Sequence, residues 1–131
     1  MNYKSLSQWK RNHFRLKVQL PVEFSVAKYL DQSVEHLREK RGTGVIHDLG
    51  EGGLSFFSPL FLPERMLVRL RFRVSTSGEF NELCRIIRVR PAGNRFFIAV
   101  KFVNMGGKRL DMIRHFIEGE VKQKMRLVEY I

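Results

Sequence analysis

The chain has 131 residues, 44% of them hydrophobic and 28% charged, and its 24 Lys and Arg against 13 Asp and Glu give a net charge of +11. This length allows one domain around a single core, and no apolar run reaches the roughly 20 residues of a membrane-spanning helix. The positive charge favours anionic partners such as nucleic acid, an anionic membrane surface or a phosphorylated small molecule. Because no signal-peptide pattern occurs and Cys84 is the single cysteine, we expect a cytoplasmic protein without disulfides or membrane insertion.

The first third of the chain predicts a basic arm, a strand and a charged connection. Residues 1–15 contain several cations and no acid, which is typical of a flexible arm. From Leu16 to Val26 apolar residues alternate with mostly polar ones, and this period of two predicts a half-buried strand. Residues 29–41 are charged and mixed, and they indicate either a short helix or an irregular connection.

Five further short segments predict strands, and turns rich in glycine or proline separate several of them. The pattern is clearest in residues 66–74, where apolar residues alternate with Arg69, Arg71 and Arg73. The predicted strands after the first are residues 42–48, 54–57, 66–74, 80–90 and 96–103. Six short strands without long helices between them predict a mainly β fold, a small six-stranded antiparallel barrel.

After residue 106 the hydrophobic period changes to that of a helix. Apolar residues recur at spacings of three and four, which predicts an amphipathic C-terminal α-helix with Gly119 in its interior. They are Leu110, Ile113, Phe116, Ile117, Val121 and Met125. The expected organisation is an arm at 1–15, a barrel at 16–105 and a helix at 106–131 that packs on the barrel or extends from it. Pairing of this helix in a homodimer stays open.

Two short motifs suggest a ligand. Arg11 and Arg15 lie four residues apart, and each guanidinium is a planar fork that can bind a phosphate or the O6/N7 edge of guanine. Asp48 begins the glycine-rich run Asp-Leu-Gly-Glu-Gly-Gly, and its carboxylate can accept hydrogen bonds from guanine N–H groups. This pairing and order resembles the PilZ domain, the bacterial receptor module for cyclic di-GMP, whose signature is RxxxR followed by [D/N]xSxxG.

The resemblance spans about residues 9–117 and implies roles for individual residues. Arg11 and Arg15 would bind the phosphates and guanine edges of cyclic di-GMP, and Asp48 would hold a guanine from the other side. Gly53 would permit the turn. No other cofactor is implied.

Two positions modify this expectation. Lys10 directly precedes RxxxR, where the family's residue influences whether one ligand or a stacked pair binds, and a basic side chain is compatible with a pair. Gly50 stands where the family has Ser and removes a hydroxyl. One lost hydrogen bond to a charged group costs about 1.5–3 kcal/mol, or about tenfold to a hundredfold in affinity.

Catalytic and metal chemistry are not expected. The four His residues and the lone Cys84 have no metal-ligand spacing. His47 and Asp48 are adjacent, but neighbouring residues on a strand should point to opposite faces, which argues against an acid–base pair. We therefore expect no enzyme.

The expected function is that of a cyclic di-GMP effector or adaptor, whose arm orders on ligand binding and signals to a downstream protein partner. One alternative is a degenerate PilZ-like adaptor that does not bind cyclic di-GMP and docks an acidic protein on its arginine-rich face. Another is a barrel that binds single-stranded nucleic acid, with Phe96 or Phe97 as stacking platforms. Most phenylalanines fall in phase with the apolar strand faces, which argues against the nucleic-acid alternative.

Overall fold

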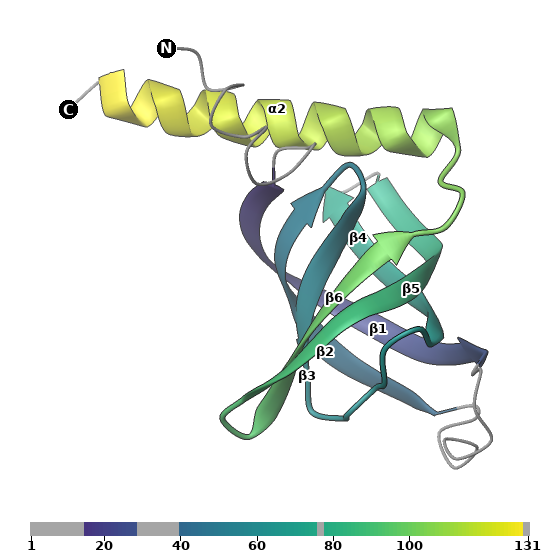
Figure 1. Cartoon of the computed structure of the whole chain (residues 1–131). Helices are drawn as coiled ribbons and strands as arrows, with labels where there is room; N and C mark the ends of the chain where they lie inside the picture. Colours follow the sequence, from purple (N-terminus) through teal and green to yellow (C-terminus); the bar gives the residue numbers. More distant parts are fainter. Residues whose placement is uncertain (1–14, 29–39, 76–77, 130–131) are drawn as a thin grey trace.

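Six antiparallel strands close into a barrel, and one long helix lies across an end of it (Figure 1). The computed structural model describes residues 15–28, 40–75 and 78–129. The strands are β1 (Arg15–Lys28), β2 (Arg41–Gly50), β3 (Gly53–Ser58), β4 (Leu67–Ser75), β5 (Gly78–Ala92) and β6 (Arg95–Phe102), and the helix is α2 (Gly107–Glu129). Their order around the barrel is β1-β2-β3-β6-β5-β4, closed by pairing of β4 with β1. The predicted six-stranded antiparallel barrel with a C-terminal helix is confirmed.

The predicted strands all form, with shifts of a few residues at their ends. Arg15, which the sequence assigned to the arm, is the first residue of β1 and pairs with Gly50 of β2. Residues 1–14 of the predicted arm and residues 29–39 of the predicted connection lie outside the described residues.

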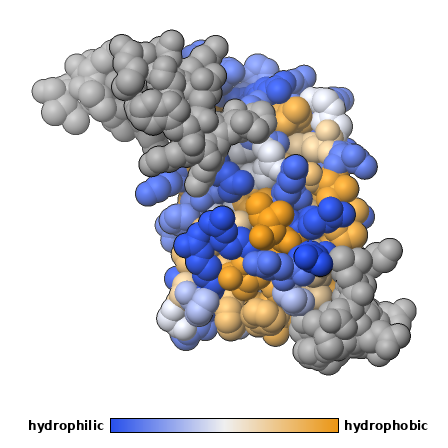
Figure 2. All heavy atoms as spheres, in the orientation of Figure 1, coloured by the Kyte–Doolittle hydropathy of each residue, from blue (hydrophilic) through white to orange (hydrophobic). Residues whose placement is uncertain are grey.

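The alternation of each strand sorts its side chains between core and surface. In β4, Val68, Leu70 and Phe72 are buried while the intervening arginines are exposed. The ring of Phe72 stacks on Phe80 of β5 with 5.1 Å between centroids. Figure 2 shows that hydrophobic side chains are interspersed among hydrophilic ones on one face of the molecule.

Helix α2 uses its apolar stripe to cover the barrel. Ile113 and Ile117 are buried in the common core, and Met112, Phe116 and Val121 pack against it. Four residues of the predicted stripe, Ile113, Phe116, Ile117 and Val121, therefore lie on the contact face of the helix. Leu110 is partly buried but is not among the residues packed on the core, and the side chain of Met125 lies outside those described. Among the described residues, no helix is long and apolar enough to cross a membrane.

Cys84 is a core residue of β5 with no exposed surface. Burial, with a further contribution from the negative charge of Glu82, raises the pKa of the Cys84 thiol to about 12, although the positive charge of Arg69 opposes this. At pH 8 the thiol is therefore protonated and shielded. We expect Ellman's reagent to modify the native protein at least about a hundredfold more slowly than the unfolded chain, because the thiolate is the reactive form. Equal rates would contradict the buried placement.

Candidate ligand-binding site

Arg15, Asp48 and Ser55 form a linked polar group on three adjacent strands. The Nη1 atom of Arg15 lies 2.8 Å from Oδ1 of Asp48, as both a hydrogen bond and an ion pair. The Ser55 hydroxyl donates to the other carboxylate oxygen, Oδ2, at 2.7 Å. Asp48 and Ser55 are 9% and 1% exposed, so the carboxylate is held on both sides in a largely water-free setting. Such a fixed carboxylate orients the planar guanidinium beside it.

A β-bulge points the Asp48 side chain outward. The pairing of β2 with β3 shifts by one residue between Ile46 and Asp48, so His47 and Asp48 together oppose Ser55. Ile46 and Leu49 on either side are fully buried, whereas His47 contacts the outward ring of Phe57. His47 and Asp48 thus lie on the same outer face, and the expectation of opposite faces was wrong. Bulges redirect side chains in this way and are frequent beside functional sites.

The two glycines of the predicted motif lie at the ends of β2 and β3. Gly50 is buried, ends β2 and pairs with Arg15. Gly53 begins β3 opposite Lys101 of β6, and a Cβ atom there would overlap the carbonyl oxygen of Val100. Its φ is not in the left-handed region, so the close approach of β6 explains the glycine. Lys10 and Arg11 lie outside the described residues, so the structure brings together Arg15, Asp48, Gly50 and Gly53 of the predicted site.

An aromatic cluster lies beside this group. The sequence reasoning named Phe97 only as a stacking platform for nucleic acid, and it missed the cluster that Phe97 forms with His47 and Phe57. The rings of His47, Phe57 and Phe97 meet edge to face, with centroids 5.5 to 5.8 Å apart. The guanidinium carbon of Arg95 lies 4.3 Å from the centroid of the Phe57 ring, a cation–π contact. All three rings are partly exposed on the outer face. The sequence did contain a signal for this cluster. Phe57 and Phe97 are each adjacent to a buried position of their strand, so alternation predicts that their side chains face outward.

Ion pairs connect the motif turn and the barrel to helix α2. Arg114 of α2 hydrogen-bonds Glu51, which lies in the turn between Gly50 and Gly53. This hydrogen bond and the charge of Glu51 raise the pKa of Arg114 above its ordinary value, so Arg114 stays charged. Near the start of the helix, Nε of Arg109 lies 2.8 Å from Oε2 of Glu82, whose side chain is only 4% exposed. The N–H is not directed at that oxygen, so this contact is an ion pair without a hydrogen bond.

A family model for the PilZ domain matches residues 10–119 of this sequence, and the chain therefore belongs to the PilZ domain family. The matched range contains both predicted motifs and all six strands of the barrel. No curated protein matches the chain significantly.

Solved structures share the fold at low sequence identity. YcgR from Escherichia coli, solved in complex with c-di-GMP, is 16% identical with a TM-score of 0.71, and the similarity covers 92% of this chain and 50% of YcgR. The MrkH–c-di-GMP complex from K. pneumonia is 14% identical with a TM-score of 0.67, covering 89% of this chain and 55% of MrkH. The chain thus spans about half the length of these two proteins.

A third relative is described by its assembly. This tetrameric PilZ domain protein from Xanthomonas campestris, self-assembled via a helical bundle, is 12% identical with a TM-score of 0.64. The similarity covers 87% of this chain and 91% of that protein.

Proposed function

We propose that this protein is a receptor for cyclic di-GMP and has no enzymatic role. The observation that carries the proposal is the Arg15–Asp48–Ser55 group. Arg15 and Asp48 lie at motif positions, and Ser55, two residues beyond Gly53, helps to fix the carboxylate that orients the guanidinium. The c-di-GMP complexes of YcgR and MrkH, which share the fold, support the same ligand class.

The proposed roles follow from the donors and acceptors that remain. Arg15 uses Nη1 on Asp48 and keeps further N–H groups of its planar fork for a phosphate or a guanine edge. Each Asp48 oxygen can accept a second hydrogen bond, so the carboxylate can also receive guanine N–H groups. Ser55 donates its one hydroxyl proton to Oδ2 of Asp48, so it fixes the carboxylate but does not replace the ligand hydrogen bond lost through Gly50. Arg11 and Lys10 would complete the phosphate contacts from the arm.

The neighbouring aromatic cluster gives guanine a stacking surface. His47 directly precedes Asp48, so a base whose edge meets the carboxylate has the rings of His47, Phe57 and Phe97 close by. Stacking of a base on an aromatic ring contributes about 1–3 kcal/mol. This contribution is comparable to the hydrogen bond lost through Gly50.

Signalling would use the two segments that adjoin the site. The arm that carries Arg11 would order over the ligand and present a new surface to a downstream protein partner. Glu51 offers a second route, because it lies in the motif turn and pairs with Arg114 of α2.

The test is calorimetric titration of the purified protein with cyclic di-GMP at near-physiological salt. Saturable binding is expected, weakened about tenfold to a hundredfold in Arg15→Ala because a charge-assisted contact is lost. Linear diguanylate tests ligand selectivity, and Arg69→Ala on β4 is the matched arginine control that should bind like the parent protein. The stoichiometry separates one ligand from a stacked pair.

Absence of binding at high micromolar ligand would reject the receptor function. Binding restored by Gly50→Ser would then identify a degenerate site, which favours the alternative of a ligand-free adaptor. Ordering of the arm has its own readout, since limited proteolysis near Trp9 should slow at saturating ligand. Unchanged cleavage there would mean that the receptor signals without ordering of its arm.

A further inference from the structure

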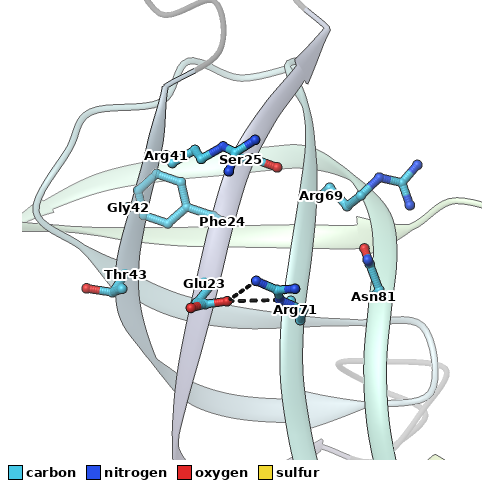
Figure 3. Close-up of a pocket in the computed structure, with 9 residues that line it drawn as sticks. All are labelled: Glu23, Phe24, Ser25, Arg41, Gly42, Thr43, Arg69, Arg71 and Asn81. Carbon is cyan, nitrogen blue, oxygen red and sulfur yellow. Dashed lines mark hydrogen bonds and ion pairs between the residues drawn. The ribbon is translucent and has the colours of Figure 1, made fainter.

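A second basic site lies over β1, apart from the motif residues. A pocket of about 410 Å³ on the outer face is lined by residues of β1, β2, β4 and β5, namely Glu23, Phe24, Ser25, Arg41, Gly42, Thr43, Arg69, Arg71 and Asn81 (Figure 3). An adjoining pocket of about 430 Å³ shares Glu23, Thr43 and Arg71 and continues to Arg73 and Glu79. Together they form one groove along β1, which we call the β1 groove.

Two arginines in the β1 groove flank a hydroxyl. Strand pairing places Ser25 directly opposite Arg41 on β2 and directly opposite Arg69 on β4. Figure 3 shows Arg41 and Arg69 on either side of β1. Both arginines are exposed, and neither forms an ion pair with a carboxylate of the described part of the chain. In Figure 3 the Arg41 side chain reaches toward Ser25 and the Arg69 side chain extends away from β1, so an anionic ligand lying across this row would meet two planar guanidinium forks and one hydroxyl.

The other charges of the groove are already balanced. Arg71 bonds Glu23 at 2.7 Å, and Arg73 bonds Glu79 at 3.0 Å. All four of these side chains are more than half exposed, so their ion pairs are weak and exchangeable. The unbalanced positive charge is therefore concentrated in the row of Arg41, Ser25 and Arg69.

The shape and repeat of the groove fit an extended peptide. Successive outward residues of a strand, such as Arg69, Arg71 and Arg73, are about 6.6–6.8 Å apart, and alternate side chains of an extended chain have the same spacing. A peptide lying along β1 can therefore place one carboxylate between Arg41 and Arg69 and others against Arg71 and Arg73. A closed barrel has no free strand edge, so recognition rests on side chains.

Single-stranded nucleic acid fits this groove less well. Binding of single strands relies on aromatic stacking platforms, and the aromatic residues in the described lining, Phe24 and Phe72, are buried at 2% and 3% exposure. The exposed Phe61 lies in the loop between β3 and β4, and the partly exposed rings of His47, Phe57 and Phe97 lie on β2, β3 and β6. β3 and β6 are on the opposite side of the barrel from β1 and β4.

We propose that the β1 groove docks an extended acidic segment of a partner protein, with a carboxylate held between Arg41 and Arg69. This site is separate from the motif residues, so the docking proposal does not depend on whether the protein binds cyclic di-GMP.

The test uses a fluorescent peptide of alternating Asp and Ser, followed by anisotropy at low salt with the full chain. The double variant Arg41→Ala/Arg69→Ala is expected to bind the peptide at least about tenfold more weakly, because two charge-assisted contacts are lost. The matched control is Arg88→Ala/Arg90→Ala, which removes the same charge from exposed positions of β5 outside the groove. It should change the affinity much less.

Several results would overturn the proposal. An equal loss of affinity in both double variants would mean that the peptide binds through diffuse charge attraction. Equal binding of a peptide of the same composition, with its Asp residues in one block, would mean that the spacing of the carboxylates does not matter. Tighter binding of oligothymidylate, lost in Arg41→Ala/Arg69→Ala, would make the groove a nucleic-acid site. No saturable binding to the parent protein would exclude the acidic peptide. Arg15→Ala should keep peptide binding, and its loss there would contradict a separate site.

Discussion

Replacing Asp48 with alanine is expected to lower the affinity for cyclic di-GMP by about a hundredfold or more, because a direct acceptor for guanine and the orientation of Arg15 are lost together. The substitution also leaves the Ser55 hydroxyl and the Arg15 guanidinium without their partner in a buried setting. Breaking a buried ion pair costs about 3–5 kcal/mol. The side chains of Arg15 and Asp48 remain 20% and 12% exposed. Because this ion pair is not fully buried, we expect a smaller loss of stability, about 2–3 kcal/mol.

Two measurements separate these effects. Urea unfolding gives the stability loss, and calorimetry under conditions where the variant is folded gives the loss of affinity. Asp48→Asn keeps the shape and one acceptor, so it should fall between the parent protein and Asp48→Ala in both. Glu64→Ala, at an exposed loop position, is the charge-matched control. Wild-type affinity in a folded Asp48→Ala protein would remove Asp48 from the site.

Replacing Gly53 with alanine is expected to destabilise the barrel by about 1–3 kcal/mol, the range for overpacking a close contact. The new Cβ would overlap the carbonyl oxygen of Val100, and a backbone atom in a paired strand cannot move aside as a side chain can. β3 and β6 would have to separate at the start of β3. The free energy of unfolding from urea denaturation measures the loss.

The same substitution at Gly119 is the matched control. A Cβ atom at Gly119 would meet no heavy atom within 4 Å, and the position is exposed on α2. Alanine there should raise stability by up to about 1 kcal/mol, because glycine is a poor helix former. A similar effect of both substitutions would mean that β3 and β6 do not approach closely at Gly53.

The two predictions concern one region, the end of the barrel under α2. Asp48 and Gly53 lie on either side of the turn that contains Glu51, and Glu51 pairs with Arg114 of the helix. A ligand that contacts this turn can therefore affect α2 through the ion pair between Glu51 and Arg114. The β1 groove is built from different residues, so ligand binding and docking of an acidic partner can be tested independently.

The sequence by itself determined the strands, the helix and the motif positions. Alternation in residues such as Val68, Arg69 and Leu70 reflects a local rule, because side chains of a strand point to opposite faces in turn. The spacing of Ile113 and Ile117 likewise reports the helix period, and both prove to be buried against the barrel. The resemblance to the PilZ family could be recognised from the residue types and their order along the chain alone.

Only the tertiary structure decided how the site is assembled. The bulge that turns His47 and Asp48 to the same face arises from the register between β2 and β3, and alternation alone predicts the opposite. The partnership of Asp48 with Ser55, the close approach of β6 to Gly53 and the meeting of Arg41 and Arg69 across Ser25 all join residues on different strands. Such contacts depend on which strands become neighbours and in which register, because the barrel closes through pairings between residues distant in sequence.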